Sequence, residues 1–314
     1  PAQVSGVPVL IRRLRGVKEM SPFLIRWLGS YPRYLALFLK RLKELAALHD
    51  TTELSEALFF QAAWDLVGSP EGALHQGCLA RTEHLAQQRR GDQALEALIH
   101  VAEGSRTTTD IGRRIGRSGL ADALQVLIEE DLVLRKGTCW LIPDPIVRCW
   151  LTTVFAPRRR GVVLDVSSLR ARFEQYLSSA WQQWLHTSQL SFADQVVRLL
   201  KSFRDETIAL DSKIGRLPQF QTIRSQRDDR GRANTYLVAE GEGKRWCCVV
   251  HDGVLDEAAV AQFNAFCRCQ TPRPSRKVVI TRSGMDENAR LVAKANSMWV
   301  WEPDDFQMLL ELYG

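Results

Sequence analysis

The spacing of apolar residues changes along this chain, and that change restricts the folds it can adopt. In the first part of the chain, apolar side chains recur three or four positions apart, which is typical of amphipathic helices. Later, short β-rich runs such as 277–281 and 298–301 alternate with further helical segments. A chain of 314 residues with 45% apolar side chains is long enough for two or three hydrophobic cores. The sequence therefore predicts a multi-domain α+β protein.

Residues 1–91 are expected to form a helical bundle. The segment from Gly29 to Pro32 interrupts a first helix, and a longer helix follows with Tyr34, Phe38 and Leu42 on one face. Thr51 or Thr52 is expected to cap the next helix. No strand pattern interrupts this region.

Residues 92–160 predict a winged-helix domain. Three helical segments follow one another, the first capped by Asp92 and the third by Ser118. Two strand-like stretches, 132–135 and 138–142, come next and are joined by Lys136 and Gly137. Three helices followed by a β-hairpin is the order of a winged helix, and a glycine suits the hairpin tip. The basic stretch 157–161 is expected to be an interdomain linker.

In a winged helix the third helix enters the major groove of DNA and the wing contacts the backbone. The candidate DNA-binding residues carry a positive charge or a hydroxyl group and lie near the second and third helices or in the wing. They are Thr107, Thr108, Arg113, Arg114, Arg117, Ser118, Arg135 and Lys136. The carboxylates of Asp122, Glu129 and Glu130 would repel phosphate if they faced it. Two alternatives therefore stay open for this module: DNA contact, and docking on another protein or domain.

Residues 161–314 are expected to form a mixed α/β domain. Phe173, Leu177 and Trp181 recur at helical spacing, and a strand hairpin, 235–239 with 246–250, follows. Strands that alternate with helices late in the chain predict a mixed or parallel sheet flanked by helices. Among the tryptophans of this segment, Trp299 is expected in the core and Trp301 partly exposed.

A metal-dependent nuclease needs two carboxylates and a lysine held on neighbouring strands. The sequence Glu242-Gly243-Lys244, with Asp211, Asp228 or Asp229 upstream, is one literal match. Because Glu242 and Lys244 fall in a predicted turn, their side chains would be loosely held. We therefore predict no catalytic residues, and the set Asp211, Glu242 and Lys244 is the alternative. The pair His251-Asp252 is either a general base or metal ligand, or an ordinary turn feature.

Composition restricts the cofactors and the compartment. The seven cysteines are odd in number and scattered, which indicates reduced thiols and a cytoplasmic protein. The four cysteines 247, 248, 267 and 269 have the wrong spacing for a zinc knuckle, so no metal site is predicted. No G-x-x-x-x-G-K-[ST] loop occurs, so this chain alone should not bind ATP well. No apolar run is long enough to cross a membrane, and a net charge of +6 is compatible with a polyanionic partner.

Three stretches line up in an order that resembles a known family. Residues 29–35, Gly-Ser-Tyr-Pro-Arg-Tyr-Leu, look like the G-x-P-x-Y-L turn in the helical lid of archaeal-type AAA+ ATPases. Residues 142–150, Ile-Pro-Asp-Pro-Ile-Val-Arg-Cys-Trp, are similar to the I-x-D-P-x-x-R-F-W step after their winged helix. Residues 277–289 resemble a strand and helix of their C-terminal restriction-endonuclease-like domain, of PD-(D/E)xK type.

The resemblance implies three parts: a helical lid at 1–91, a winged helix at 92–160 and a restriction-endonuclease-like domain at 161–314. ATP and magnesium would be involved only if an ATPase core lies upstream. The nuclease-like domain usually carries an Asp on one strand and Glu-x-Lys on the next, but residues 234–236 and 249–252 occupy those strands here.

We therefore expect a non-catalytic portion of an AAA+ ATPase-like protein. Its expected partner is double-stranded DNA, the upstream ATPase core or a partner protein. The alternatives are an active metal-dependent DNA nuclease and a winged-helix transcription regulator. The regulator would need a well-formed apolar pocket in residues 162–314.

Overall fold

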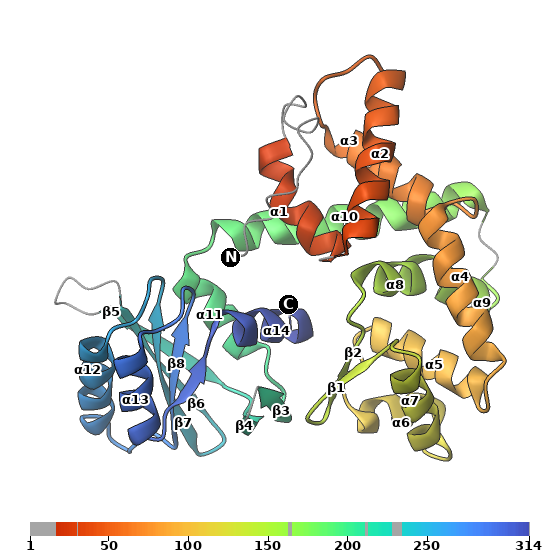
Figure 1. Cartoon of the computed structure of the whole chain (residues 1–314). Coiled ribbons are helices and arrows are strands. Elements are labelled where there is room, and N and C mark those ends of the chain that lie inside the picture. Colours follow the sequence, from red (N-terminus) through yellow and green to blue (C-terminus); the bar gives the residue numbers. More distant parts are fainter. Residues whose placement is uncertain (1–16, 30, 163–164, 211–212, 228–233, 314) are drawn as a thin grey trace. The chain divides into compact units, whose positions relative to one another are not determined.

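The computed structural model describes residues 17–29, 31–162, 165–210, 213–227 and 234–313. It is a mixed α+β structure, as predicted, with two two-stranded sheets and one five-stranded sheet among these residues (Figure 1). The chain divides into two compact units. The first comprises Pro1–Arg135 and Trp140–Leu185, and the second comprises Lys136–Cys139 and His186–Gly314.

The first unit begins with helices that share one apolar core. They are α1 (Val17–Leu28), α2 (Pro32–Leu48), α3 (Glu56–Ala63) with the π-helical turn η2 (Trp64–Gly68), and α4 (Ala73–Ala86). Ser55, rather than Thr51 or Thr52, caps α3, because its hydroxyl accepts a hydrogen bond from the Leu58 N–H at 3.2 Å.

The long helix α10 (Val166–Gln189) was expected to open the third segment, but most of it packs in the first unit. Phe173 and Leu177 are fully buried there, and Trp181 is 6% exposed. The Trp181 ring contacts Phe23 edge to face at 5.0 Å between ring centroids. The apolar stripe was correctly identified from its spacing, but spacing does not tell which core a stripe will join.

Three helices and a hairpin follow in the predicted order: α5 (Gly91–Ala102), α6 (Thr108–Ile115), α7 (Leu120–Glu129), β1 (Leu134–Lys136) and β2 (Cys139–Leu141). The expected cap of α5 lies two residues too late, and that of α7 lies one residue too early. Arg90 takes the N-cap position of α5 in place of Asp92, and Gly119, with φ +70°, takes that of α7 in place of Ser118. A left-handed backbone conformation favours glycine, which explains the second difference.

A continuous helical run precedes α10 in the first unit: α8 (Pro145–Trp150), the π-helical turn η3 (Leu151–Phe155) and α9 (Ala156–Arg159). The expected linker at 157–161 is therefore partly helical. At the start of this run, the Tyr34 hydroxyl donates a 2.6 Å hydrogen bond to Asp144 Oδ2, and Asp144 caps α8. Tyr34 and Asp144 belong to the first two stretches that resemble the AAA+ family, so those stretches are in direct contact.

In the second unit, α11 (Phe192–Lys201) precedes a two-stranded ribbon, β3 (Glu206–Leu210) with β4 (Lys213–Leu217), which the sequence pattern had not indicated. The main sheet follows in chain order: β5 (Thr222–Arg227), β6 (Asn234–Gly241), β7 (Lys244–His251), β8 (Arg276–Thr281) and β9 (Trp299–Trp301). The pairs β5–β6 and β6–β7 are antiparallel, and β7–β8 and β8–β9 are parallel.

Helices cover both faces of this sheet (Figure 1). One face carries α12 (Glu257–Arg268) and α13 (Glu287–Ala295), and the other carries α11 and α14 (Pro303–Tyr313). Trp301, expected to be partly exposed, is fully buried and contacts Trp246 and Phe203 edge to face. None of the helices in the described ranges is both long and apolar enough to span a membrane.

Candidate nucleic-acid interface

The turn between α6 and α7 carries three exposed arginines. Arg113 and Arg114 lie in the last turn of α6, and Arg117 follows Gly116, whose φ of +88° lets the chain reverse there. Arg113 lies 3.5 Å from Asp110 in an exposed ion pair. Arg114 lies near enough to Glu103 to help lower the pKa of that carboxyl group, but neither its guanidinium nor that of Arg117 makes a hydrogen bond or salt bridge with a residue that the structure describes. Two positive charges are therefore available to an external partner at this turn.

The predicted hydroxyl donors are partly committed to the fold. Thr107 donates its hydroxyl proton to Asp110 at 2.7 Å and caps α6, so this proton is not available to a phosphate. Thr108 accepts a hydrogen bond from the Trp140 indole at 2.9 Å and keeps its own proton. Ser118 has an exposed side chain, while its carbonyl oxygen accepts a bond from Gln93 at 2.6 Å.

The two predicted wing residues differ in environment. Arg135 is exposed, and its guanidinium lies over the Trp140 ring at 5.5 Å from the centroid. Lys136 ends β1 and is half-buried. The exposed part of Arg135 therefore lies beside an aromatic ring, whereas Lys136 is more enclosed.

The exposed face of α7 is acidic. Asp122, Gln125 and Glu129 are exposed, and Gln125 donates a 3.0 Å hydrogen bond to Glu129. Arg90 offsets part of this charge, since its Nε lies 3.5 Å from Asp122 Oδ2. The basic surface is therefore concentrated at the α6–α7 turn and does not extend along the outer face of α7.

Two of the alternative nuclease residues lie at the hairpin that joins β6 and β7. Glu242 is exposed with φ +44°, Gly243 follows with φ +74°, and Lys244 begins β7 half-buried. Asp211, the third member, lies outside the described residues, as do Asp228 and Asp229. Glu242 therefore lies in the turn, as predicted, whereas Lys244 is paired with Gly241 in the ladder between β6 and β7 and not in the turn.

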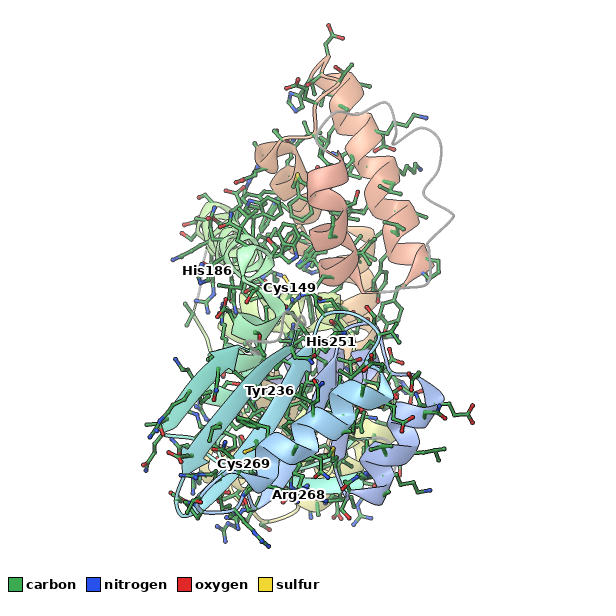
Figure 2. The ribbon with its side chains drawn as sticks, turned by 90° about the vertical axis from the view of Figure 1, so that its left-hand side faces the viewer. Cys149, His186, Tyr236, His251, Arg268 and Cys269 are labelled. Carbon is green, nitrogen blue, oxygen red and sulfur yellow. The ribbon has the colours of Figure 1, made fainter. Side chains whose placement is uncertain are left out.

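The opposite end of the same two strands has a different character. His251 and Asn234 are register partners, and the His251 Nδ1 lies 2.7 Å from the Asn234 Oδ1. Two residues before His251, Val249 is fully buried in a core with Tyr236, whose ring stacks on Phe266 at 4.6 Å. Figure 2 labels Tyr236 and His251. Asp252 lies 3.2 Å from Arg282 in an exposed ion pair. The sequence did not identify the Asn234–His251 pair, because pairing residues 17 apart requires the strand register.

The cysteines are not assembled into a metal site. Cys247 on β7 and Cys267 on α12 are buried and hydrogen-bonded to each other, whereas Cys269 is exposed. Burial raises the pKa of the Cys248 thiol well above its ordinary range. Across the ranges that the structure covers, no group of three or more His, Cys, Asp or Glu side chains could hold a metal ion.

Comparisons with known proteins identify no relative of this chain. No family model matches it, no curated protein matches it, and no solved structure matches it. Its function has therefore to be inferred from its own residues.

Proposed function

We propose that this chain is a non-catalytic, double-stranded-DNA-binding portion of an AAA+ ATPase-like protein. In this proposal α5, α6, α7 and the β1–β2 hairpin form a winged helix, and residues 190–314 include a degenerate restriction-endonuclease-like fold. The observation that carries the proposal is the pair Arg114 and Arg117, which are exposed and have no hydrogen-bonding or salt-bridge partner in the described part of the chain. Arginines in this state can neutralise backbone phosphates without first breaking an internal ion pair.

The acidic face of α7 favours one orientation on DNA. Arg117 and Ser118 immediately precede the N-terminus of α7, while Glu129 lies at its other end. An N-terminal approach would bring the arginine and the positive end of the helix dipole to the phosphates and keep Glu129 away. It also brings Asp122, in the first turn of α7, but Arg90 lies 3.5 Å from that carboxylate and offsets part of its charge. We therefore expect contacts that are mostly with the backbone and a weak preference for sequence.

The second unit supports binding without cleavage. Under the resemblance, β6 and β7 are the strands that would carry the acidic residues and the lysine. They carry Asn234, Val249 and His251 instead, and Val249 is fully buried against α12. A carboxylate at that position would have to be buried in an apolar core, which is costly without a compensating cation.

ATP hydrolysis is not expected of this chain, because it lacks the phosphate-binding loop. In the proposal, ATP and magnesium are involved only if an ATPase core lies upstream. That core, or a partner protein, is the second expected binding partner. A cytoplasmic location stays part of the proposal, supported by the unpaired state of the seven cysteines.

A salt-titrated binding measurement tests the proposal. Fluorescence anisotropy with a labelled duplex of about 20 base pairs would be recorded from about 50 to 200 mM salt. We expect affinity to fall steeply with salt, and the double variant Arg114→Ala/Arg117→Ala to bind about tenfold more weakly with a shallower salt dependence. The matched control Arg268→Ala/Arg273→Ala removes the same charge from exposed positions in the second unit and should bind like the wild type. Equal binding by all three proteins would contradict the proposal.

A second candidate function is docking on a basic protein surface. It is favoured by the exposed carboxylates of Asp122 and Glu129 on α7. This alternative predicts no duplex binding even at low salt. It also predicts that Asp122→Asn/Glu129→Gln weakens capture of the ATPase core, whereas Arg114→Ala/Arg117→Ala does not.

A further inference from the structure

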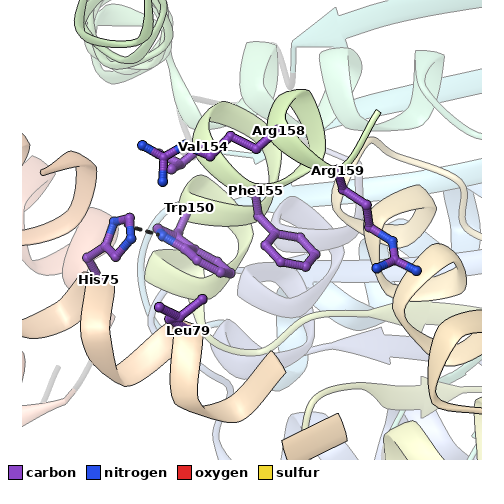
Figure 3. A pocket seen from close by; sticks show the side chains of 7 residues that line it. All are labelled: His75, Leu79, Trp150, Val154, Phe155, Arg158 and Arg159. Carbon is purple, nitrogen blue, oxygen red and sulfur yellow. Dashed lines mark hydrogen bonds between the residues drawn. The ribbon is translucent and has the colours of Figure 1, made fainter. Parts of the chain in front are cut away.

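A cavity of about 340 Å³ in the first unit has no role in the proposed function (Figure 3). Its volume is at the small end of the range for small-molecule sites, which suits a ligand the size of a mononucleotide or smaller. The aliphatic side chains that line it are Leu79 and Val154, and the aromatic ones are Trp150 and Phe155. His75, Arg158 and Arg159 complete the lining, which includes no acidic side chain of the described chain.

The π-helical turn η3 produces the aromatic wall. Trp150 and Phe155 are five residues apart, which on an α-helix would separate them by about 140° around the axis. A π-helical turn closes with an i to i+5 hydrogen bond and brings such residues to the same side. Their rings accordingly stack, with centroids 5.0 Å apart and planes inclined by 26°. Such single π turns are frequent at functional sites, because they distort a helix at a cost in stability.

Side chains satisfy the backbone groups that this turn disturbs. The Thr153 hydroxyl donates to the Cys149 carbonyl at 2.7 Å, and the Thr152 hydroxyl donates to the Arg148 carbonyl at 2.9 Å. The second π turn of the unit, η2, places the Val67 carbonyl oxygen 3.2 Å from His75 Nδ1. Both irregular turns therefore contribute to the surroundings of one buried histidine.

His75 lies between Trp150 and a backbone carbonyl group. The Trp150 Nε1 lies 3.1 Å from His75 Nδ1, and an indole nitrogen can only donate. The Val67 carbonyl oxygen, which can only accept, lies 3.2 Å from the same Nδ1, so this nitrogen is within hydrogen-bonding distance of one donor and one acceptor. Burial lowers the pKa of His75, which keeps the ring neutral near pH 7. The contact with His75 fixes the orientation of the Trp150 ring.

The two arginines of the cavity are not equivalent. Arg159 is held by Asp92 at 2.9 Å and Glu96 at 2.7 Å, whereas the Arg158 guanidinium has no hydrogen bond or salt bridge to any residue in the described ranges. Figure 3 shows the two guanidinium groups reaching to opposite sides of the aromatic pair. An aromatic wall, an unpaired cation at one side and no acidic lining together select a flat ring that carries one negative charge.

We propose that this cavity binds a planar aromatic ring bearing a single phosphate or carboxylate group. The ring packs against Phe155 and Leu79, which are partly exposed, while Trp150 is 1% exposed and supports Phe155 from behind, and the anion pairs with Arg158. A nucleoside monophosphate and an aromatic carboxylate both have this chemistry. None of the residues that line this cavity belongs to the α6–α7 turn, so ligand binding here can be tested independently of DNA binding.

Isothermal titration calorimetry on the full chain tests the proposal with two sets of probes at about 1 mM. One set is AMP, GMP, CMP and UMP, and the other is indole-3-acetate and benzoate. Adenosine and indole-3-methanol are the uncharged counterparts. We expect at least one charged probe to bind, and its uncharged counterpart to bind about tenfold more weakly. If the tighter ligand is a nucleoside monophosphate, the cavity prefers a phosphate group, and if it is an aromatic acid, the cavity prefers a carboxylate.

Two variants assign the binding to the cavity. Arg158→Ala removes the proposed anion partner and should weaken binding about tenfold, whereas Arg89→Ala, an equally exposed arginine of the same unit, should not. Leu79→Trp should fill the cavity and abolish binding, and circular dichroism would check that it folds. The proposal is overturned if no charged probe binds the wild type, if adenosine binds as tightly as AMP, or if Arg158→Ala binds as tightly as the wild type.

Discussion

Two arginine-rich turns of the first unit look alike in sequence but differ in their surroundings. Arg159 and Arg160, at the end of α9, are paired with carboxylates of α5 and its C-cap: Arg159 with Asp92 and Glu96, and Arg160 with Glu103. At the α6–α7 turn, the nearest carboxylate pairing is a single exposed contact at 3.5 Å. The first group therefore ties α9 to α5, whereas Arg114 interacts with Glu103 only at longer range and Arg117 makes no salt bridge in the described part of the chain. A run of arginines in a sequence does not reveal which of these roles it has.

The largest expected effect comes from reversing charge at the available turn. Arg114→Glu/Arg117→Glu should weaken duplex binding by about a hundredfold at low salt, because each glutamate adds repulsion to the lost attraction. Arg159→Ala/Arg160→Ala should change affinity by less than about threefold. Anisotropy titrations of both variants at one salt concentration make the comparison. If the two variants lost similar affinity, the distinction between the arginine groups would be wrong.

The next largest effect is on the free energy of unfolding. Here the paired arginine, Arg159, should matter more than Arg114, which is the reverse of the order expected for duplex binding. Arg159→Ala should lower the free energy of unfolding by about 1 kcal/mol, since it removes two partly exposed ion pairs with α5. Arg114→Ala should change it by less than about 0.5 kcal/mol, because no ion pair is lost. Urea unfolding followed by circular dichroism measures both. A larger loss for Arg114→Ala would show that this residue supports the fold.

A smaller effect should appear in the pH dependence of stability. The hydrogen bond from Arg160 holds the pKa of Glu103 below its ordinary value of 4.5. A carboxyl group with a lowered folded-state pKa stabilises the fold at pH values above its ordinary pKa, and this contribution is lost as pH falls through the lowered pKa. Arg160→Ala should therefore be less stable than the wild type at pH 7, and the difference should shrink below about pH 4.5. Unfolding free energies at pH 7 and pH 3.5 provide the check, and a constant difference would argue against this ion pair.

The smallest effect is expected at Arg113. Its exposed contact with Asp110 has little energetic value, so Arg113→Ala should change stability by less than about 0.5 kcal/mol. Its effect on duplex affinity should also be smaller than that of Arg114→Ala or Arg117→Ala, because Asp110 already offsets part of its charge. Side-by-side titrations of the three single variants rank them. An Arg113→Ala variant with the largest loss would move the centre of the proposed interface toward α6.

The order of helices and strands was largely predictable because apolar spacing and caps are local properties. The hairpin expected at 235–239 and 246–250 was located within two residues at each end, as β6 and β7. The β3–β4 ribbon was missed. Its second strand exposes Lys213, Ile214 and Arg216, and this pattern does not alternate as a half-buried strand does.

The candidate site was less predictable, because availability depends on contacts between distant residues. The arginines of the α6–α7 turn could be found from composition. Whether an arginine forms an ion pair, as Arg159 and Arg160 do, depends on which carboxylates lie beside it in the folded chain. The π turn that brings Trp150 and Phe155 together has no local pattern that distinguishes it from an α-helix.

The central claim is that the chain binds double-stranded DNA without cutting it. The most direct measurement incubates the protein with a labelled duplex in magnesium or manganese and analyses the same samples on native and denaturing gels. Our account predicts a shifted band on the native gel and full-length strands on the denaturing gel, with the shift reduced for Arg114→Ala/Arg117→Ala. Nicked or shortened strands, or an unshifted duplex at low salt, would contradict it.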